Sequence, residues 1–203
     1  MKNIKFTSGV LLAFSLLFSG CGGGDGSSGS SDGGTINSSE IATFSIEVLK
    51  TGQIKSYDVN GTEITDGSQK DDGFYKSGLA RSYTRDVNDT VTENTTKLIW
   101  QDDTTPASMT WDSAITYCQN LTLGGHTDWR LPDIKELQTL VDNSKSDPSM
   151  DSIFQNTISS YYWSITSYVA LSSNAWSVHF FTGYTSADDK TDSNINVRCV
   201  KSI

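Results

Sequence analysis

The clearest structural signal in the sequence is the run Asp128-Trp129-Arg130-Leu131-Pro132-Asp133-Ile134-Lys135-Glu136-Leu137. Proline suits the start of a helix, and Asp133 and Glu136 have the spacing of a capping box, with Asp in place of Ser or Thr. The run therefore predicts a helix that begins after Pro132. Its expected buried stripe is Ile134, Leu137, Leu140 and Val141, and its expected end is marked by Asn143, Ser144 and Pro148.

A second amphipathic helix is predicted upstream of this run. Apolar residues recur there at helical spacing on one face, namely Trp111, Ala114, Ile115, Cys118 and Leu121. Thr110 can cap this helix, and Asp112 suits its first turn because the N-terminal end of a helix dipole favours negative charge. Gly124-Gly125 is expected to end it.

Strand-like segments lie on both sides of the two helices. The upstream candidates are residues 44–49, 54–59, 82–86, 91–92 and 97–101, with a hairpin around Asn88-Asp89 and irregular β structure over 52–78. The downstream candidates are residues 161–166, 175–181 and 197–200. Trp176, Val178 and Phe180 share one strand face, so His179 is expected to be exposed on the other. Strands, two helices and further strands predict an α+β domain.

The N-terminus has the pattern of an export signal. Lys2 and Lys5 precede the apolar run Val10–Phe18, which is too short to span a bilayer. Ser19-Gly20-Cys21 then resembles the lipobox of bacterial lipoproteins, in which the cysteine is acylated, although Phe18 stands where Leu is usual. An ordinary secretory signal is the alternative. From the lipobox we expect a lipid anchor at Cys21 in the cell envelope. No Asp follows Cys21 directly, so the inner-membrane retention signal of enteric lipoproteins is absent, and by that analogy we expect the outer membrane.

Composition divides the rest of the chain into a tether and a folded body. Residues 21–43 are rich in Gly and Ser and lack the apolar content needed to fold, so they are expected to form a flexible tether with a reach of roughly 25 Å. Residues 44–93 are predicted to form a β-rich extension, and residues 94–203 the main domain.

The charge of the chain excludes one class of partner. The formal net charge is -9, and removal of residues 1–20, which contain Lys2 and Lys5 and no acidic residue, changes it to -11. Such a surface repels phosphate backbones, so nucleic acid is not expected to bind. The acidity also argues against purely electrostatic binding of anionic glycans or lipids, and solubility is its simplest explanation.

Two cysteines remain in the body of the chain after lipidation of Cys21. Cys118 lies on the apolar face of the first predicted helix, and Cys199 lies in the last predicted strand. An even pair in an oxidising compartment predicts a disulfide. A reactive thiol is the alternative, but neither cysteine has an adjacent His or a C-x-x-C partner.

Several motifs together resemble one family. In order along the chain they are Trp111-Asp112-x-Ala114-Ile115-x-Tyr117-Cys118, Leu123-Gly124-Gly125-x-x-Asp128-Trp129-Arg130-Leu131-Pro132-x-x-Lys135-Glu136-Leu137, Tyr162-Trp163-Ser164, Ala175-Trp176 and Val197-Arg198-Cys199-Val200. Over about residues 94–201 the chain resembles the DUF1566 family, also called the Lcl C-terminal domain family.

The resemblance implies a fold and a class of ligand. The fold is C-type-lectin-like, with two helices on a twisted antiparallel sheet, long loops, and a bridge from the first helix to the last strand. The adhesin after which the family is named binds sulfated polysaccharides through this domain. The present chain lacks the collagen-like repeat of that adhesin, so transfer of the adhesin's role does not follow directly.

The sequence carries no recognisable catalytic motif. His126 and His179 are far apart, so no zinc site is expected, and no nucleophile elbow is present. Asp188, Asp189, Asp192 and Asn194 offer oxygen ligands for calcium, but they match no known loop, and a solvated acidic loop is the simpler interpretation. Trp111, Trp163 and Trp176 are expected in the core, and Arg130 in a structural ion pair.

The sequence favours a non-catalytic binding module over an enzyme. Loops at about 168–174 and 182–195 are predicted to recognise a polysaccharide or a surface protein. The candidate ligand-binding residues are Tyr168, Asn174, Tyr184, Asp188, Asp189, Asp192 and Asn194. An envelope assembly or structural protein that binds a protein partner is the alternative. No cofactor is expected, apart from the calcium option above.

Overall fold

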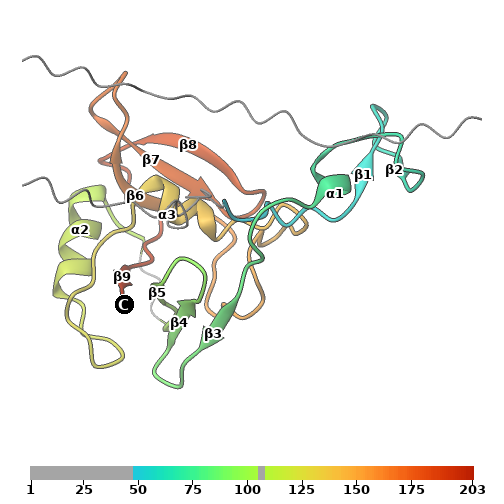
Figure 1. Cartoon of the computed structure of the whole chain (residues 1–203). Helices are drawn as coiled ribbons and strands as arrows, with labels where there is room; N and C mark the ends of the chain where they lie inside the picture. The colour runs from blue at the N-terminus through green and yellow to red at the C-terminus, as the bar shows by residue number, and fades with distance from the viewer. Residues whose placement is uncertain (1–47, 105–107) are drawn as a thin grey trace, which may run out of the picture. The chain divides into compact units, whose positions relative to one another are not determined.

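The computed structural model describes residues 48–104 and 108–203 (Figure 1). The predicted signal peptide, Cys21, the tether and most of the predicted strand 44–49 lie outside these residues. Within the described ranges, no helix has the length and apolar character needed to span a bilayer. The architecture is α+β with antiparallel sheets, as the sequence predicts.

A three-stranded sheet forms the centre of the domain. Strands β6 (Tyr161–Ser167), β7 (Asn174–His179) and β8 (Tyr184–Asp189) follow one another as antiparallel hairpins in the order β6-β7-β8. The sequence prediction of a loop over 182–195 is therefore wrong for β8. That strand consists mainly of Thr, Ser, Ala and Asp, so it lacks the hydrophobic alternation that identifies a half-buried strand.

A four-stranded antiparallel sheet has the order β3-β4-β5-β9, formed by Tyr83–Arg85, Thr90–Glu93, Leu98–Gln101 and Val200–Ser202. The predicted hairpin around Asn88-Asp89 is confirmed, and Asp89 has a left-handed φ of 59°. The last strand begins at Val200 and not at Val197 as predicted. Residues 197–199 are buried, and the Gln101 N–H donates to the Cys199 carbonyl, but the register with β5 starts at Val200.

The extension before β3 contains little regular structure. Strands β1 (Ser56–Tyr57) and β2 (Glu63–Ile64) form a short hairpin, as expected for irregular β structure. The one-turn helix α1 (Asp72–Tyr75) is not predicted by the sequence. The Asp71 carboxylate caps it by accepting a hydrogen bond from the Phe74 N–H.

Two helices lie where the sequence predicts them. Helix α3 (Ile134–Thr139) has the predicted capping box between Asp133 and Glu136, but it ends at Thr139, before the predicted end at Asn143 and Ser144. Helix α2 (Trp111–Asn120) ends at Asn120, so the prediction that Gly124-Gly125 ends it is wrong. These glycines instead form the turn between Leu123 and His126, with φ of 62° and 79°. The Thr110 hydroxyl does not cap the helix and donates to Ser113 Oγ.

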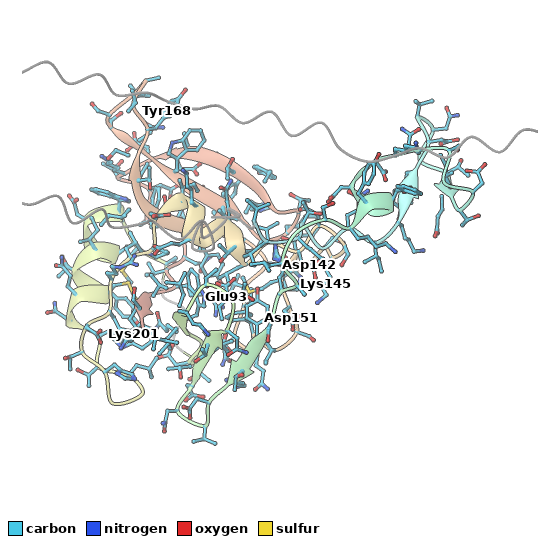
Figure 2. All side chains as sticks on the ribbon, in the orientation of Figure 1. Glu93, Asp142, Lys145, Asp151, Tyr168 and Lys201 are labelled. Carbon is cyan, nitrogen blue, oxygen red and sulfur yellow. A yellow bond between two sulfur atoms is a disulfide. The ribbon has the colours of Figure 1, made fainter. Side chains whose placement is uncertain are left out.

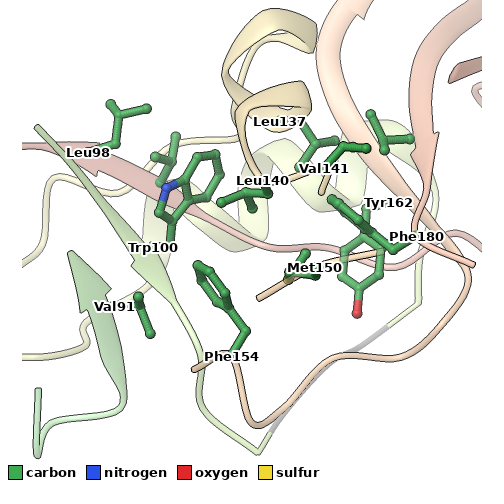
Figure 3. Close-up of a cluster of buried hydrophobic side chains, with 12 residues drawn as sticks. Val91, Leu98, Trp100, Leu137, Leu140, Val141, Met150, Phe154, Tyr162 and Phe180 are labelled. Atoms are coloured by element: carbon green, nitrogen blue, oxygen red, sulfur yellow. The ribbon is translucent and has the colours of Figure 1, made fainter. Parts of the chain in front are cut away.

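The sheet β6-β7-β8 separates two hydrophobic clusters. One cluster, drawn in Figure 3, joins α3 to the sheet through Leu137, Leu140, Tyr162, Val178 and Phe180. The other lies under α2 and includes Cys118, Trp163 and Ala175. Both faces of the sheet are therefore buried near its middle.

Three ion pairs of the domain are buried or half-buried. Asp102 has no exposed side-chain surface and pairs with both Arg85 and Arg198. Arg130 pairs with Glu136 at 2.6 Å, so its predicted structural role is confirmed. Burial alone raises the pKa of the Glu136 carboxyl, but hydrogen bonds from Arg130 and the Asp133 N–H outweigh burial and lower the pKa overall.

The predicted disulfide is present. Cys118 on α2 and Cys199 beside β9 are joined, with a Cα–Cα distance of 5.5 Å and a sequence separation of 81 residues. Both residues are fully buried. The bond therefore fixes α2 against the C-terminal segment from inside the second cluster.

Replacement of Glu136 by Gln tests the charged capping box. Because the folded-state pKa lies below the usual value of 4.5, the carboxylate stabilises the fold above that pH, and this contribution is lost as the pH falls through the folded-state pKa. We expect Glu136→Gln to lower the free energy of unfolding by about 1 kcal/mol near neutral pH, with a smaller difference at acid pH. Urea unfolding at several pH values measures it. A change in unfolding free energy that is the same at all pH values would contradict this role of the Glu136 charge. Glu63→Gln is the control, because it removes the charge of an exposed ion pair with Lys55.

Loss of the disulfide is expected to destabilise the domain. The Cys118→Ala and Cys199→Ala double variant should lose about 2–4 kcal/mol of unfolding free energy, because closure of a long loop no longer restricts the unfolded chain. Urea unfolding of residues 22–203 measures this loss. Intact mass of the unreduced wild-type protein is the control, and two free thiols there would refute the bond.

Candidate binding surface

The structure distributes the predicted ligand-binding residues over two faces of one sheet. Alternate residues of β7 and β8 point to opposite faces. Asn174 and Asp189 are cross-strand partners and share the α3 face with Trp176 and Val178. Tyr184 and Asp188 therefore lie on the other face. Asp192 and Asn194 follow β8 in the connection to the C-terminal segment. The seven candidates consequently do not form one site.

An aromatic pair stands at the end of the β6–β7 hairpin. Tyr168 and Trp176 are both half-buried, and their rings meet edge to face at 5.1 Å. The Tyr168 N–H donates to the Asn174 carbonyl, which closes the hairpin, and the Ser164 hydroxyl donates to the Trp176 carbonyl. Figure 2 shows Tyr168 at the tip of this hairpin. These hydrogen bonds fix the backbone of the hairpin that carries the pair, and both residues remain partly exposed.

The core prediction for the tryptophans holds in part. Trp163 is fully buried, as predicted. Trp111 is partly buried, its indole N–H donates to the Ser164 carbonyl, and the Lys190 ammonium lies 4.3 Å from its ring centroid. Trp176 is only half-buried, because the α3 side of β7 is covered at Val178 but less so toward the hairpin tip.

Polar side chains border the aromatic pair. Asn174 donates through Nδ2 to the Ala187 carbonyl at 3.1 Å and accepts from the Ser173 hydroxyl. The Asp189 carboxylate accepts from the N–H and hydroxyl of Thr191, and these bonds lower its pKa. Asp189 is therefore an ionised acceptor at neutral pH. Ring surface, amide and carboxylate thus lie together where β7 begins and β8 ends, a surface called the aromatic edge below.

The remaining acidic candidates are engaged by their neighbours. Asp188 accepts hydrogen bonds from the hydroxyls of Ser177 and Ser186. Asp192 accepts from the N–H and side-chain amide of Asn194. Across residues 48–104 and 108–203, no group of three or more His, Cys, Asp or Glu side chains is arranged to hold a metal ion. The calcium option at Asp188, Asp189, Asp192 and Asn194 therefore gains no support.

A second aromatic cluster lies on the opposite face of the sheet. His179 packs between Tyr161 and Tyr184, with ring centroids 4.2 Å and 5.0 Å away. The expectation that His179 is exposed is therefore wrong; it is half-buried. The hydrogen bond between the two tyrosine hydroxyls, together with burial, raises the pKa of Tyr161 to about 12. Sequence reasoning misses this cluster because its members come from three different strands and meet only through the sheet register.

Fold and surface together define a disulfide-bridged α+β domain with a half-exposed aromatic edge. The family model described as the Lcl C-terminal domain matches residues 89–201, and the chain belongs to this family. The match begins before the predicted domain start at residue 94 and includes β4, an inner strand of the four-stranded sheet. A comparison with curated proteins gave no match.

Proposed function

We propose that this chain is a lipid-anchored envelope lipoprotein whose non-catalytic domain, of C-type-lectin-like fold, binds a polysaccharide through the edge formed by Tyr168, Asn174, Trp176 and Asp189. The observation that carries this proposal is the half-buried Tyr168–Trp176 pair on the same sheet face as two polar side chains.

The chemistry of the edge suits a sugar. Aromatic rings present an apolar face together with a polar tip, and they lose little conformational entropy when a ligand orders them. Sugar rings carry C–H groups that pack on such faces and hydroxyls that need hydrogen-bond partners. Asn174 can donate and accept, and the ionised Asp189 accepts. Because Asp189 is charged and the whole chain has a net charge of -9, a neutral polysaccharide is favoured at this edge.

Aromatic substitutions test the edge. In soluble residues 22–203, we expect Trp176→Ala and Tyr168→Ala each to weaken binding of a neutral polysaccharide about tenfold, because each removes a stacking surface. Binding to a panel of neutral and acidic polysaccharides, with calcium and then with chelator, measures the effect, and chelator should leave the affinity unchanged.

Tyr75→Ala is the matched control, because Tyr75 is exposed and also belongs to an edge-to-face aromatic pair, but lies in the extension. Binding that survives both edge substitutions would remove the sugar site from this edge. Failure of the wild-type chain to bind any member of the panel would favour a protein partner.

Lipid anchoring is tested independently of the ligand. Cells that express the full-length chain should incorporate labelled palmitate into it, and Cys21→Ser should abolish this because the acylated thiol is gone. Cys118→Ser, in a parallel culture, should still be labelled. Equal labelling of the Cys21→Ser variant would refute the anchor, and fractionation of the envelope would report whether the labelled protein lies in the outer membrane.

A protein partner is the second candidate, and one observation favours it. Val169 and Leu171, next to Tyr168 on the hairpin, are 97% and 54% exposed. Two exposed apolar side chains beside the aromatic pair enlarge the apolar surface of this tip, and contiguous apolar surface is typical of protein contacts. Affinity capture from membranes with the wild-type chain and a Val169→Asp variant would distinguish the candidates, since a stoichiometric protein lost in the variant supports an assembly role.

A further inference from the structure

A cleft lies where the extension meets helix α3. Its volume is about 530 Å³, and its walls come from residues 48–51, Arg81, Thr96, the exposed side of α3 and residues near Val141. The charged residues in its lining are Lys50, Arg81 and Lys135, and the lining contains no acidic residue. This composition is unusual for a chain with a net charge of -9.

The three cations of this cleft are not neutralised by carboxylates. Among the residues that the structure describes, Lys50, Arg81 and Lys135 form no ion pair. Arg81 instead donates to two carbonyl oxygens, from Nη1 to Thr139 at 2.7 Å and from Nε to Lys50 at 3.3 Å. These bonds fix the guanidinium at the junction while its positive charge stays uncompensated.

Carboxylates beside the lining are engaged by other groups: Asp142, between the lining residues Val141 and Asn143, pairs with Lys145, and two others bind threonines. The fully buried Glu93 accepts from the Thr139 hydroxyl, and Asp72 accepts from the Thr51 hydroxyl. Both bonds end on threonines of the lining and not on its cations. The hydroxyl oxygen of Thr96, also in the lining, is buried and has no hydrogen-bond partner among the described residues. The cleft therefore offers three positive charges.

The donors favour a tetrahedral oxyanion over a carboxylate. Arginine grips a carboxylate with two parallel N–H bonds, but Arg81 already uses Nε and Nη1 on carbonyls. The two lysines act as point charges without a planar preference, which suits an anion with oxygens in several directions. A volume of about 530 Å³ also has room for more than the anionic group itself.

We propose that this cleft binds a phosphate or sulfate group carried by a larger ligand, with Lys50, Arg81 and Lys135 supplying the positive charge. Lys50 and Arg81 precede the matched family region 89–201, so the site requires the extension as well as the family domain. It is separate from the aromatic edge and does not depend on sugar binding there.

Equilibrium dialysis of the full-length chain in non-ionic detergent, against labelled inorganic phosphate and labelled sulfate at low ionic strength, tests the site. We expect one saturable site, weakened about tenfold or more by Lys135→Glu, because reversal of one charge replaces attraction with repulsion. Lys50→Gln should weaken it less but measurably. Lys135 is exposed and makes no recorded side-chain hydrogen bond, so its substitution should leave the fold intact; the thermal midpoint checks this.

Lys70→Glu is the matched control, since Lys70 is exposed, lies outside the cleft and undergoes the same charge change. Unchanged affinity in Lys70→Glu, together with the two cleft effects, supports the proposal, and tighter binding of phosphate or of sulfate then identifies which ester the ligand carries. Equal weakening by Lys70→Glu, no saturable binding below about 10 mM, or equally tight binding of acetate would overturn it.

Discussion

The buried Asp102 carboxylate organises this domain. It has no exposed side-chain surface, so its charge must be satisfied by groups that folding brings to it. Arg198 pairs with it at 2.9 Å, Arg85 pairs with its second oxygen, and the N–H groups of Gln155 and Asn156 complete the set. These partners come from β3, from the segment before β6 and from the C-terminal segment. Removal of any one leaves a buried charge incompletely paired, and this ties four distant parts of the chain to one position.

The same region joins charge to the hydrophobic core. The Arg198 guanidinium lies 5.0 Å from the Phe154 ring and near Tyr162, both members of the cluster drawn in Figure 3. One residue further along, Cys199 forms the disulfide to α2 in the opposite cluster. Consecutive residues of the C-terminal segment therefore contact both hydrophobic clusters, one on each face of the sheet β6-β7-β8. The β6–β7 hairpin continues beyond these clusters.

The hairpin end of the sheet β6-β7-β8 gives the domain its candidate surface. Where the helices and the C-terminal segment cover the sheet, its side chains are buried; beyond them, Tyr168 and Trp176 keep part of their rings in water. The cationic cleft lies elsewhere, at the junction of α3 with the extension. The molecule thus separates an aromatic, acidic edge from a basic cleft, although its total charge is strongly negative.

Local sequence determined the elements whose stabilising contacts are close in the chain. The Asp133–Glu136 capping box, the hairpin at Asn88-Asp89 and the apolar face of α2 follow from spacing and from residue type. The Cys118–Cys199 pair is 81 residues apart in the chain, and it was predictable because these are the two cysteines left after Cys21. Only tertiary structure decided which side chains meet across segments. Strand β8 is held by pairing with β7 and lacks a pattern of its own, and register placed His179 among tyrosines and divided the acidic candidates between two faces. The partners of Asp102 are far apart in the chain, and so are the three cations of the cleft. Local residue spacing therefore cannot predict that these groups meet. Long-range packing brings such groups together, and it fixed the sites that local propensity left open.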